Sequence, residues 1–137
     1  MNWTRRRFLK GSLAGVTGAL PLLPSVHAAG RRRRLKIAAV TTAYFKYSHS
    51  QHIVDRFLEG YGWEGRHHRP DMDVVSLYVE QVGENDISRE RLKRYPGMKH
   101  AKTIEQALTL GTGKLAVDGV LLIGEHGNYP VNEKGQT

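Results

Sequence analysis

Residues 124–130 (GEHGNYP) contain several side chains that could do chemistry, directly after the apolar run 117–123. They include a carboxylate (Glu125), an imidazole (His126), an amide (Asn128) and a phenol (Tyr129). The run is typical of a strand buried in the middle of a parallel sheet, and ligands bind beyond the carboxyl ends of such strands. We therefore predict that Glu125 and His126 are catalytic. We predict that Asn128 and Tyr129 contact the substrate; the alternative is a plain turn with solvated side chains.

Three histidines offer a second kind of chemistry. His49 and His52 follow the first apolar run of the chain, and His126 follows the last one. If these runs are parallel strands, the three imidazoles could converge with Glu125 into a site for zinc or a similar divalent metal. The alternative is that each histidine is an ordinary loop or capping residue.

A basic loop lies before the second long apolar run. It consists of Arg66, His67, His68 and Arg69. Guanidinium groups bind phosphates and carboxylates, so we predict that these four residues bind an anion, such as a phosphate or a sugar acid, if the loop folds over the site. The alternative is a solvated basic loop.

The spacing of apolar residues predicts strands that alternate with helices. Strands are expected at 35–42, 73–82, 98–101 and 117–123, helices at 51–60, 86–94 and 103–110, and an irregular loop at 61–70. This alternation predicts an α/β fold, a three-layer Rossmann-like arrangement with a parallel sheet in the middle. A sheet that stops just after a central strand is incomplete. We therefore expect residues 35–137 to be the N-terminal part of a longer protein, truncated after the fourth strand.

Three of these stretches resemble a known family. Residues 35–40 (LKIAAV), 103–108 (TIEQAL) and 117–123 (VDGVLLI) resemble the first strand, a short helix and the fourth strand in the N-terminal domain of the glucose–fructose oxidoreductase / inositol dehydrogenase (Gfo/Idh/MocA) family. The resemblance covers about residues 35–130. It implies an oxidoreductase that acts on a sugar or polyol with a nicotinamide cofactor, and it makes His126 the histidine of a loop that contacts the cofactor.

The resemblance also implies where NAD(P) would bind. Thr42, Ala43 and Tyr44 occupy the loop after the first strand, and Glu80 would hold the ribose hydroxyls. Residues 41–46 (TTAYFK) lack the glycines of the family's G-x-G-x-x-G motif, which allow the backbone to approach the pyrophosphate. The alternative is therefore a non-catalytic or metal-binding ligand-binding domain of the same fold.

The first 28 residues have the features of an export signal. Residues 4–10 (TRRRFLK) match the twin-arginine pattern at every position, and a short apolar segment and small residues before a cleavage site after Ala28 follow. The apolar segment is too short and too rich in glycine and proline to span a membrane. We expect residues 1–28 to engage the twin-arginine export machinery and the mature protein to be periplasmic or secreted.

The net charge of +8 lies in two terminal segments. Half of it belongs to the signal peptide and half to residues 31–34, so the folded part is close to neutral. Because this part has no basic stripe with interleaved aromatic residues, we expect no nucleic-acid partner. Residues 29–34 are expected to form a disordered basic arm, or alternatively an anchor to an anionic surface. The absence of cysteine excludes disulfides and thiolate metal sites.

Overall fold

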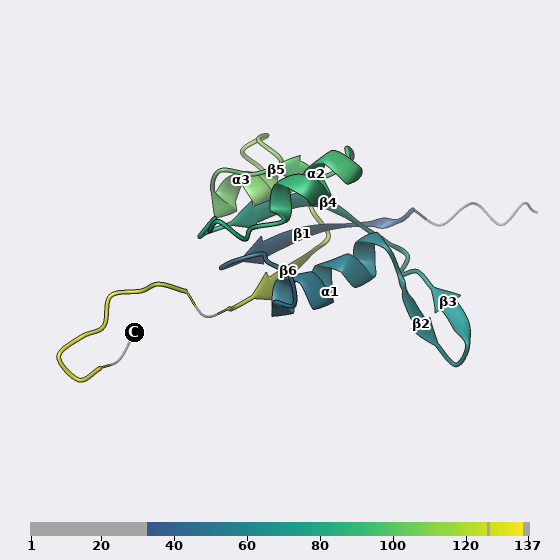
Figure 1. The fold of residues 1–137 in the computed structure, drawn as a ribbon. Coiled ribbons are helices and arrows are strands. Elements are labelled where there is room, and N and C mark those ends of the chain that lie inside the picture. Colours follow the sequence, from purple (N-terminus) through teal and green to yellow (C-terminus); the bar gives the residue numbers. More distant parts are fainter. Residues whose placement is uncertain (1–32, 126, 136–137) are drawn as a thin grey trace, which may run out of the picture. The chain divides into compact units, whose positions relative to one another are not determined.

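A four-stranded parallel sheet is the centre of the structure (Figure 1). The computed structural model describes residues 33–125 and 127–135, so the predicted signal peptide, most of the basic arm and His126 lie outside the described residues. The sheet order is β5-β4-β1-β6. Its strands are β1 (Leu35–Thr41), β4 (Met72–Val79), β5 (Lys99–His100) and β6 (Gly119–Ile123).

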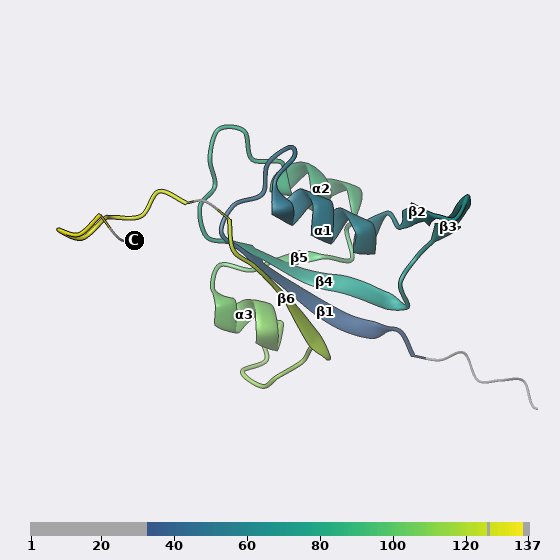
Figure 2. The ribbon, with the colours of Figure 1, turned by 90° about the horizontal axis from the view of Figure 1, so that it is seen from below.

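Helices cover both faces of this sheet (Figure 2). Helices α1 (His49–Leu58) and α2 (Ser88–Arg94) pack on one face, and α3 (Ile104–Thr109) packs on the other. All three pairings in the sheet are parallel. The predicted α/β fold with a parallel sheet is therefore confirmed.

Strand β1 supplies side chains to both layers of the core. Ala39 belongs to an apolar cluster on the α1 and α2 face, where Leu77 of β4 is fully buried. Ala38 and Val40 point to the other face and join a cluster with Ala107 of α3. Because neighbouring residues of a strand point to opposite faces, the unbroken apolar run of β1 matches a strand covered on both sides.

Side-chain caps fix the starts of two helices. The Ser48 hydroxyl accepts a hydrogen bond from the backbone N–H of Gln51 at 3.1 Å, and the Thr103 hydroxyl accepts one from Gln106 at 3.0 Å. Such caps satisfy N–H groups that have no partner within the helix. Helix α1 therefore begins at His49, two residues before its predicted start, because Ser48 is its cap.

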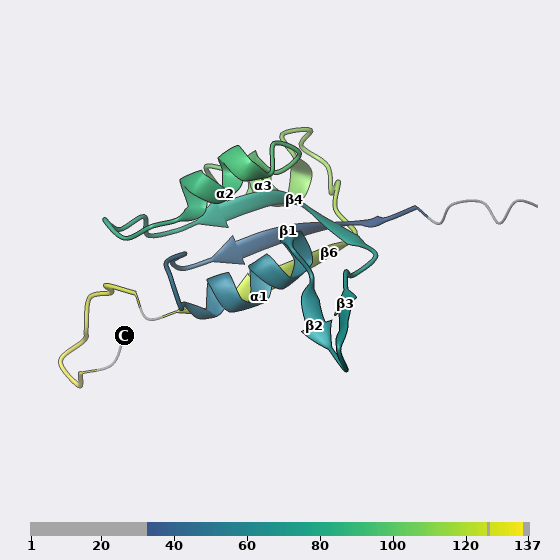
Figure 3. The same ribbon diagram turned by 45° about the vertical axis from the view of Figure 1, so that its right-hand side comes forward.

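The prediction of an irregular loop at 61–70 is wrong. This stretch forms an antiparallel hairpin of β2 (Tyr61–Trp63) and β3 (Arg66–His68), which extends away from the main sheet (Figure 3). The turn residues Glu64 and Gly65 have φ angles of 48° and 70°. A two-residue turn with positive φ at both positions matches the twist of a hairpin.

The prediction that residues 117–123 lie in the middle of the sheet is also wrong for the described residues. There β6 pairs with β1 alone, and its burial alternates. Val120 and Leu122 lie in register with Ala38 and Val40, on the face of α3, and Leu122 is 80 % exposed. The apolar run therefore lies at an edge of the sheet, with one face partly uncovered.

Two arginines of the predicted disordered arm have defined partners. Arg33 pairs with Asp118 at 2.7 Å, and Arg34 pairs with Asp73 at 2.9 Å. Asp118 also accepts a hydrogen bond from the backbone N–H of Lys36, and these two hydrogen bonds hold its pKa at about 2. From Arg33 onward the arm is therefore held at the amino end of the sheet by ion pairs with Asp118 and Asp73.

Candidate functional site

The carboxyl ends of β1, β4 and β6 lie along one edge of the sheet, which we call the carboxyl edge (Figure 1). The backbone N–H of Thr42 donates to the carbonyl of Ile123 at 3.3 Å, and the N–H of Gln81 donates to the carbonyl of Thr42 at 2.7 Å. These bonds hold the three segments that follow the strands side by side. The polar segments after Thr42, Val79 and Ile123 therefore share one edge of the sheet.

Glu125 places a carboxylate at the start of α1. Its Oε2 accepts a hydrogen bond from the backbone N–H of His49 at 2.6 Å, and its Oε1 pairs with His49 Nδ1 at 2.9 Å. The Glu125 side chain is 6 % exposed, whereas that of His49 is 72 % exposed. Helix α1 has no acidic residue in its own first turn, so Glu125 supplies the negative charge that the positive end of the helix dipole favours.

A second set of contacts joins the segment after β6 to the end of β4. The Tyr129 hydroxyl donates to Glu80 Oε2 at 2.6 Å. The Gln81 side chain accepts a hydrogen bond from the backbone N–H of Asn128 at 2.8 Å. The hydrogen bond to Glu80 favours the neutral phenol and raises the pKa of Tyr129. Glu80 and Tyr129, predicted to contact cofactor and substrate separately, therefore contact each other.

Replacing Glu80 with glutamine is expected to bring the pKa of Tyr129 back toward its ordinary value. A neutral amide stabilises the neutral phenol less than a carboxylate does, so the phenol would ionise at lower pH. A pH titration followed by NMR of the Tyr129 ring measures this change. Glu84→Gln is the matched control, because Glu84 is an exposed acid of the same loop and has no contact with Tyr129. An unchanged titration of Tyr129 in Glu80→Gln would contradict the contact.

Gly127 allows these contacts to form. A Cβ atom at this position would lie 2.4 Å from the Tyr129 ring, 2.9 Å from Thr42 Cγ2 and 3.0 Å from Gln81 Nε2. The backbone of residue 127 therefore approaches the ends of β1 and β4 more closely than a side chain permits. Sequence reasoning placed this glycine in the site segment but gave it no role.

A cavity of about 150 Å³ opens beside these contacts, between the loops that follow β1 and β4. Its polar lining residues are Gln81, Asn85, Asp86 and Asn128, and Ala43 also lines it. The Oδ1 atom of Asp86 accepts hydrogen bonds from Ser88, whereas its buried Oδ2 has no hydrogen-bond partner among the described residues. A buried carboxylate oxygen without a donor is costly, and the residue that carries it lines this cavity.

Tyr44, a predicted cofactor contact, is anchored in the core. Its side chain is fully buried, and its hydroxyl donates to Asp55 of α1 at 2.5 Å. Burial and this hydrogen bond raise the pKa of Tyr44. Arg91 of α2 forms a bidentate ion pair with the same carboxylate, with Arg91 Nη2 at 2.7 Å from Asp55 Oδ2. Tyr44 therefore fixes the loop between Ala43 and α1, and its hydroxyl is not available to a ligand.

The predicted metal ligands do not form a cluster within the described residues. No group of three or more histidine, aspartate and glutamate side chains is suitably placed for a metal there. His49 is engaged by Glu125, and the His52 ring stacks on Tyr47 with a centroid distance of 6.5 Å. The third predicted ligand, His126, lies outside the described residues, so the metal site stays a prediction.

The basic loop does not fold over the carboxyl edge. Arg66, His67 and His68 form β3, and Arg69 follows it directly. This hairpin leads into the amino end of β4, at the opposite edge of the sheet from the segments after β1 and β6 (Figure 1). The four residues therefore do not contribute to the cavity beside Asp86.

Gln81 and Asp86 are site residues that sequence reasoning missed. Gln81 directly follows Glu80, and a polar pair at the end of a strand was the available signal. Asp86 begins the predicted helix at 86–94, and its Oδ1 accepts a hydrogen bond from the backbone N–H of Ser88 at 2.9 Å. Nothing in the sequence indicates that its second oxygen is buried without a partner.

No family model, curated protein or solved structure matches this chain. None of the helices in the described part of the chain has the length and hydropathy that crossing a membrane requires. The function is therefore inferred from the site itself.

Proposed function

We propose that this chain is a Rossmann-like domain of an exported protein that binds a small polyhydroxylated ligand, a sugar or polyol, at the carboxyl edge of its sheet. The observation that carries the proposal is the cavity beside Asp86, with its polar lining of carboxylate and amide side chains. Export rests on the twin-arginine pattern of residues 4–10 and places the protein in the periplasm or outside the cell.

The strand order supports the Rossmann-like part of the proposal. Counted along the chain, the four parallel strands lie in the order third, second, first, fourth. Dinucleotide-binding sheets have the same order for their first four strands, and ligands bind where the order reverses. In this chain the reversal lies between β1 and β6, at the edge that carries Thr42 and Glu125.

The chemistry of the cavity favours hydroxyl groups. The side-chain amides of Asn85 and Asn128 can both donate and accept hydrogen bonds, and a carboxylate such as that of Asp86 accepts them, whereas the amide of Gln81 already pairs with the backbone of Asn128. A polyol presents alternating donors and acceptors that can satisfy such a lining. The volume of about 150 Å³ is below the range of about 300–1,000 Å³ that is usual for drug-sized ligands, so the ligand is of monosaccharide size or smaller.

The second candidate is an NAD(P)-dependent oxidoreductase that acts on a sugar or polyol, and the strand order together with Glu80 favours it. Glu80 would bind the ribose hydroxyls, and Glu125 and His126 would serve the reaction. Glu125 is the reason we rank this candidate second. Its carboxylate occupies the start of α1, where a pyrophosphate would bind, and like charges repel.

One set of titrations separates the two candidates. Calorimetry of the full chain with myo-inositol, glucose and glycerol is expected to show binding, and Asp86→Asn is expected to weaken it about tenfold or more, the size of one hydrogen bond to a charged group. Glu84→Gln is the control. Binding of NADH that Glu80→Gln weakens would replace the first candidate with the second. Absence of both kinds of binding would contradict the proposal.

A further inference from the structure

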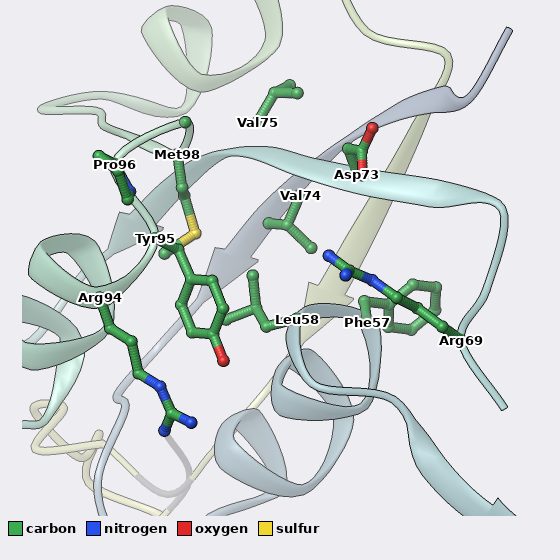
Figure 4. Close-up of a pocket in the computed structure, with 11 residues that line it drawn as sticks. Phe57, Leu58, Arg69, Asp73, Val74, Val75, Arg94, Tyr95, Pro96 and Met98 are labelled. Carbon is green, nitrogen blue, oxygen red and sulfur yellow. The ribbon is translucent and has the colours of Figure 1, made fainter. Parts of the chain in front are cut away.

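A second cavity, of about 380 Å³, lies on the α1 and α2 face of the sheet (Figure 4). It opens between the end of α1, the start of β4 and the segment that joins α2 to β5. This is the amino half of β4, so the cavity is separate from the carboxyl edge and plays no part in the proposed function. Its volume is within the range that is usual for small-molecule sites.

The floor of this cavity is apolar. Leu58, Val74 and Met98 line it and are almost fully buried. Two half-buried aromatic residues, Phe57 and Tyr95, extend the same surface toward the opening. The floor can therefore cover a hydrocarbon body of several carbon atoms, and each CH₂ group transferred from water strengthens binding by up to about fourfold.

Arg69 brings a positive charge to the mouth of the cavity. Figure 4 shows its guanidinium beside Phe57 and directed toward Val74. Within the described residues, the Arg69 side chain forms no ion pair or hydrogen bond.

The other charged groups at the mouth are already paired. Arg94 Nη1 lies 2.8 Å from Glu59 Oε1, and the carboxylate of Asp73 pairs with Arg34 at 2.9 Å. Among the described residues, the charge of Arg69 therefore has no counter-ion at the edge of the apolar floor.

We propose that this cavity binds a small carboxylic acid with an apolar body, whose carboxylate pairs with Arg69 and whose hydrocarbon part lies on Leu58, Val74 and Met98. A guanidinium matches a carboxylate with two parallel hydrogen bonds, which gives the ligand an orientation. A purely polar anion would leave the floor uncovered, and a neutral hydrocarbon would leave the guanidinium unpaired. Of the four residues of the basic loop predicted to bind an anion, this proposal uses Arg69 alone. The anion would bind at the amino half of β4 and not over the carboxyl edge.

Hexanoate is the probe, titrated into the full chain and followed by NMR of the methyl groups of Leu58, Val74 and Met98. We expect hexanoate to shift these signals. We expect 1-hexanol to bind several-fold more weakly, and Arg69→Gln to weaken hexanoate binding by a similar factor of up to about fivefold, which is what an ion pair with an exposed guanidinium contributes. Arg66→Gln is the matched control, because Arg66 belongs to the same hairpin and does not line the cavity. It should leave the affinity unchanged.

Several results would overturn the proposal. They are methyl signals that hexanoate leaves unmoved, equal binding of hexanoate and 1-hexanol, and equal losses in Arg69→Gln and Arg66→Gln. The Arg69 side chain is exposed, so its replacement is not expected to disturb folding, and the amide spectrum of the variant verifies this. Polyol binding is measured at the carboxyl edge and hexanoate binding at these methyl groups. A negative result for one proposal therefore leaves the other unaffected.

Discussion

Replacing Arg91 with methionine is expected to lower the free energy of unfolding by about 3–5 kcal/mol, the usual cost of breaking a buried ion pair from one side. The Arg91 side chain is 10 % exposed, and its partner Asp55 is 15 % exposed. Without Arg91 the carboxylate of Asp55 keeps one neutral donor, the hydroxyl of Tyr44. Thermal or urea unfolding of the full chain, followed by circular dichroism, measures the loss.

Two further variants make this prediction specific. Arg94→Met removes an ion pair of the same helix whose partners are 58 % and 39 % exposed, so we expect a cost of at most about 1 kcal/mol. Adding Asp55→Asn to Arg91→Met removes the uncompensated charge, so the double variant should be less destabilised than the sum of the two single variants. Equal losses for Arg91→Met and Arg94→Met would show that the pair with Asp55 is not buried in solution.

Replacing Gly60 with alanine is expected to lower the free energy of unfolding by about 2–3 kcal/mol, because backbone strain and a steric clash coincide there. Gly60 has a φ of 89°, in the left-handed region, and a Cβ would lie 2.4 Å from the carbonyl oxygen of His68. The same atom would lie 2.4 Å from Nε2 of His67, which donates to the carbonyl of Glu59 at 2.9 Å. Urea unfolding of the variant measures the cost.

The same hairpin provides the control for Gly60. Gly62 of β2 has nothing within 4 Å of its Cβ position and no positive φ, so Gly62→Ala should change stability by no more than about 0.5 kcal/mol. Since Gly60 sets the start of the hairpin that leads to Arg69, Gly60→Ala should also weaken hexanoate binding. If Gly60→Ala and Gly62→Ala have equal stability, the hairpin does not pack as described.

The main elements of the fold could be predicted from sequence because their signals are local. The strands predicted at 35–42 and 73–82 are rich in apolar residues, and the three helices and the short strand at 99–100 begin and end within two residues of their predicted bounds. The hairpin could not be predicted in this way. All residues of β2 and β3 are exposed, so no alternation of apolar and polar residues marks them. Only the two-residue turn at Glu64 and Gly65 indicates the hairpin.

The site was predictable in place but not in its contacts. Parallel strands bring their carboxyl ends to one edge, so Thr42, Glu80 and Glu125 could be placed together from sequence. Their pairing partners depend on how loops pack. Tyr44 turns into the core because its hydroxyl donates to Asp55, the carboxylate that Arg91 also binds, and Asp55 and Arg91 lie 36 positions apart on different helices. No local pattern specifies such a contact.

The most direct test of the proposed ligand site is an NMR titration of the full chain with myo-inositol, observed at the side-chain amides of Gln81, Asn85 and Asn128. These three residues line the cavity beside Asp86. We predict that their signals shift and saturate with myo-inositol, glucose or glycerol, and that hexanoate leaves them in place. Side-chain amide signals that none of the three polyols moves would contradict a polyol site at the carboxyl edge.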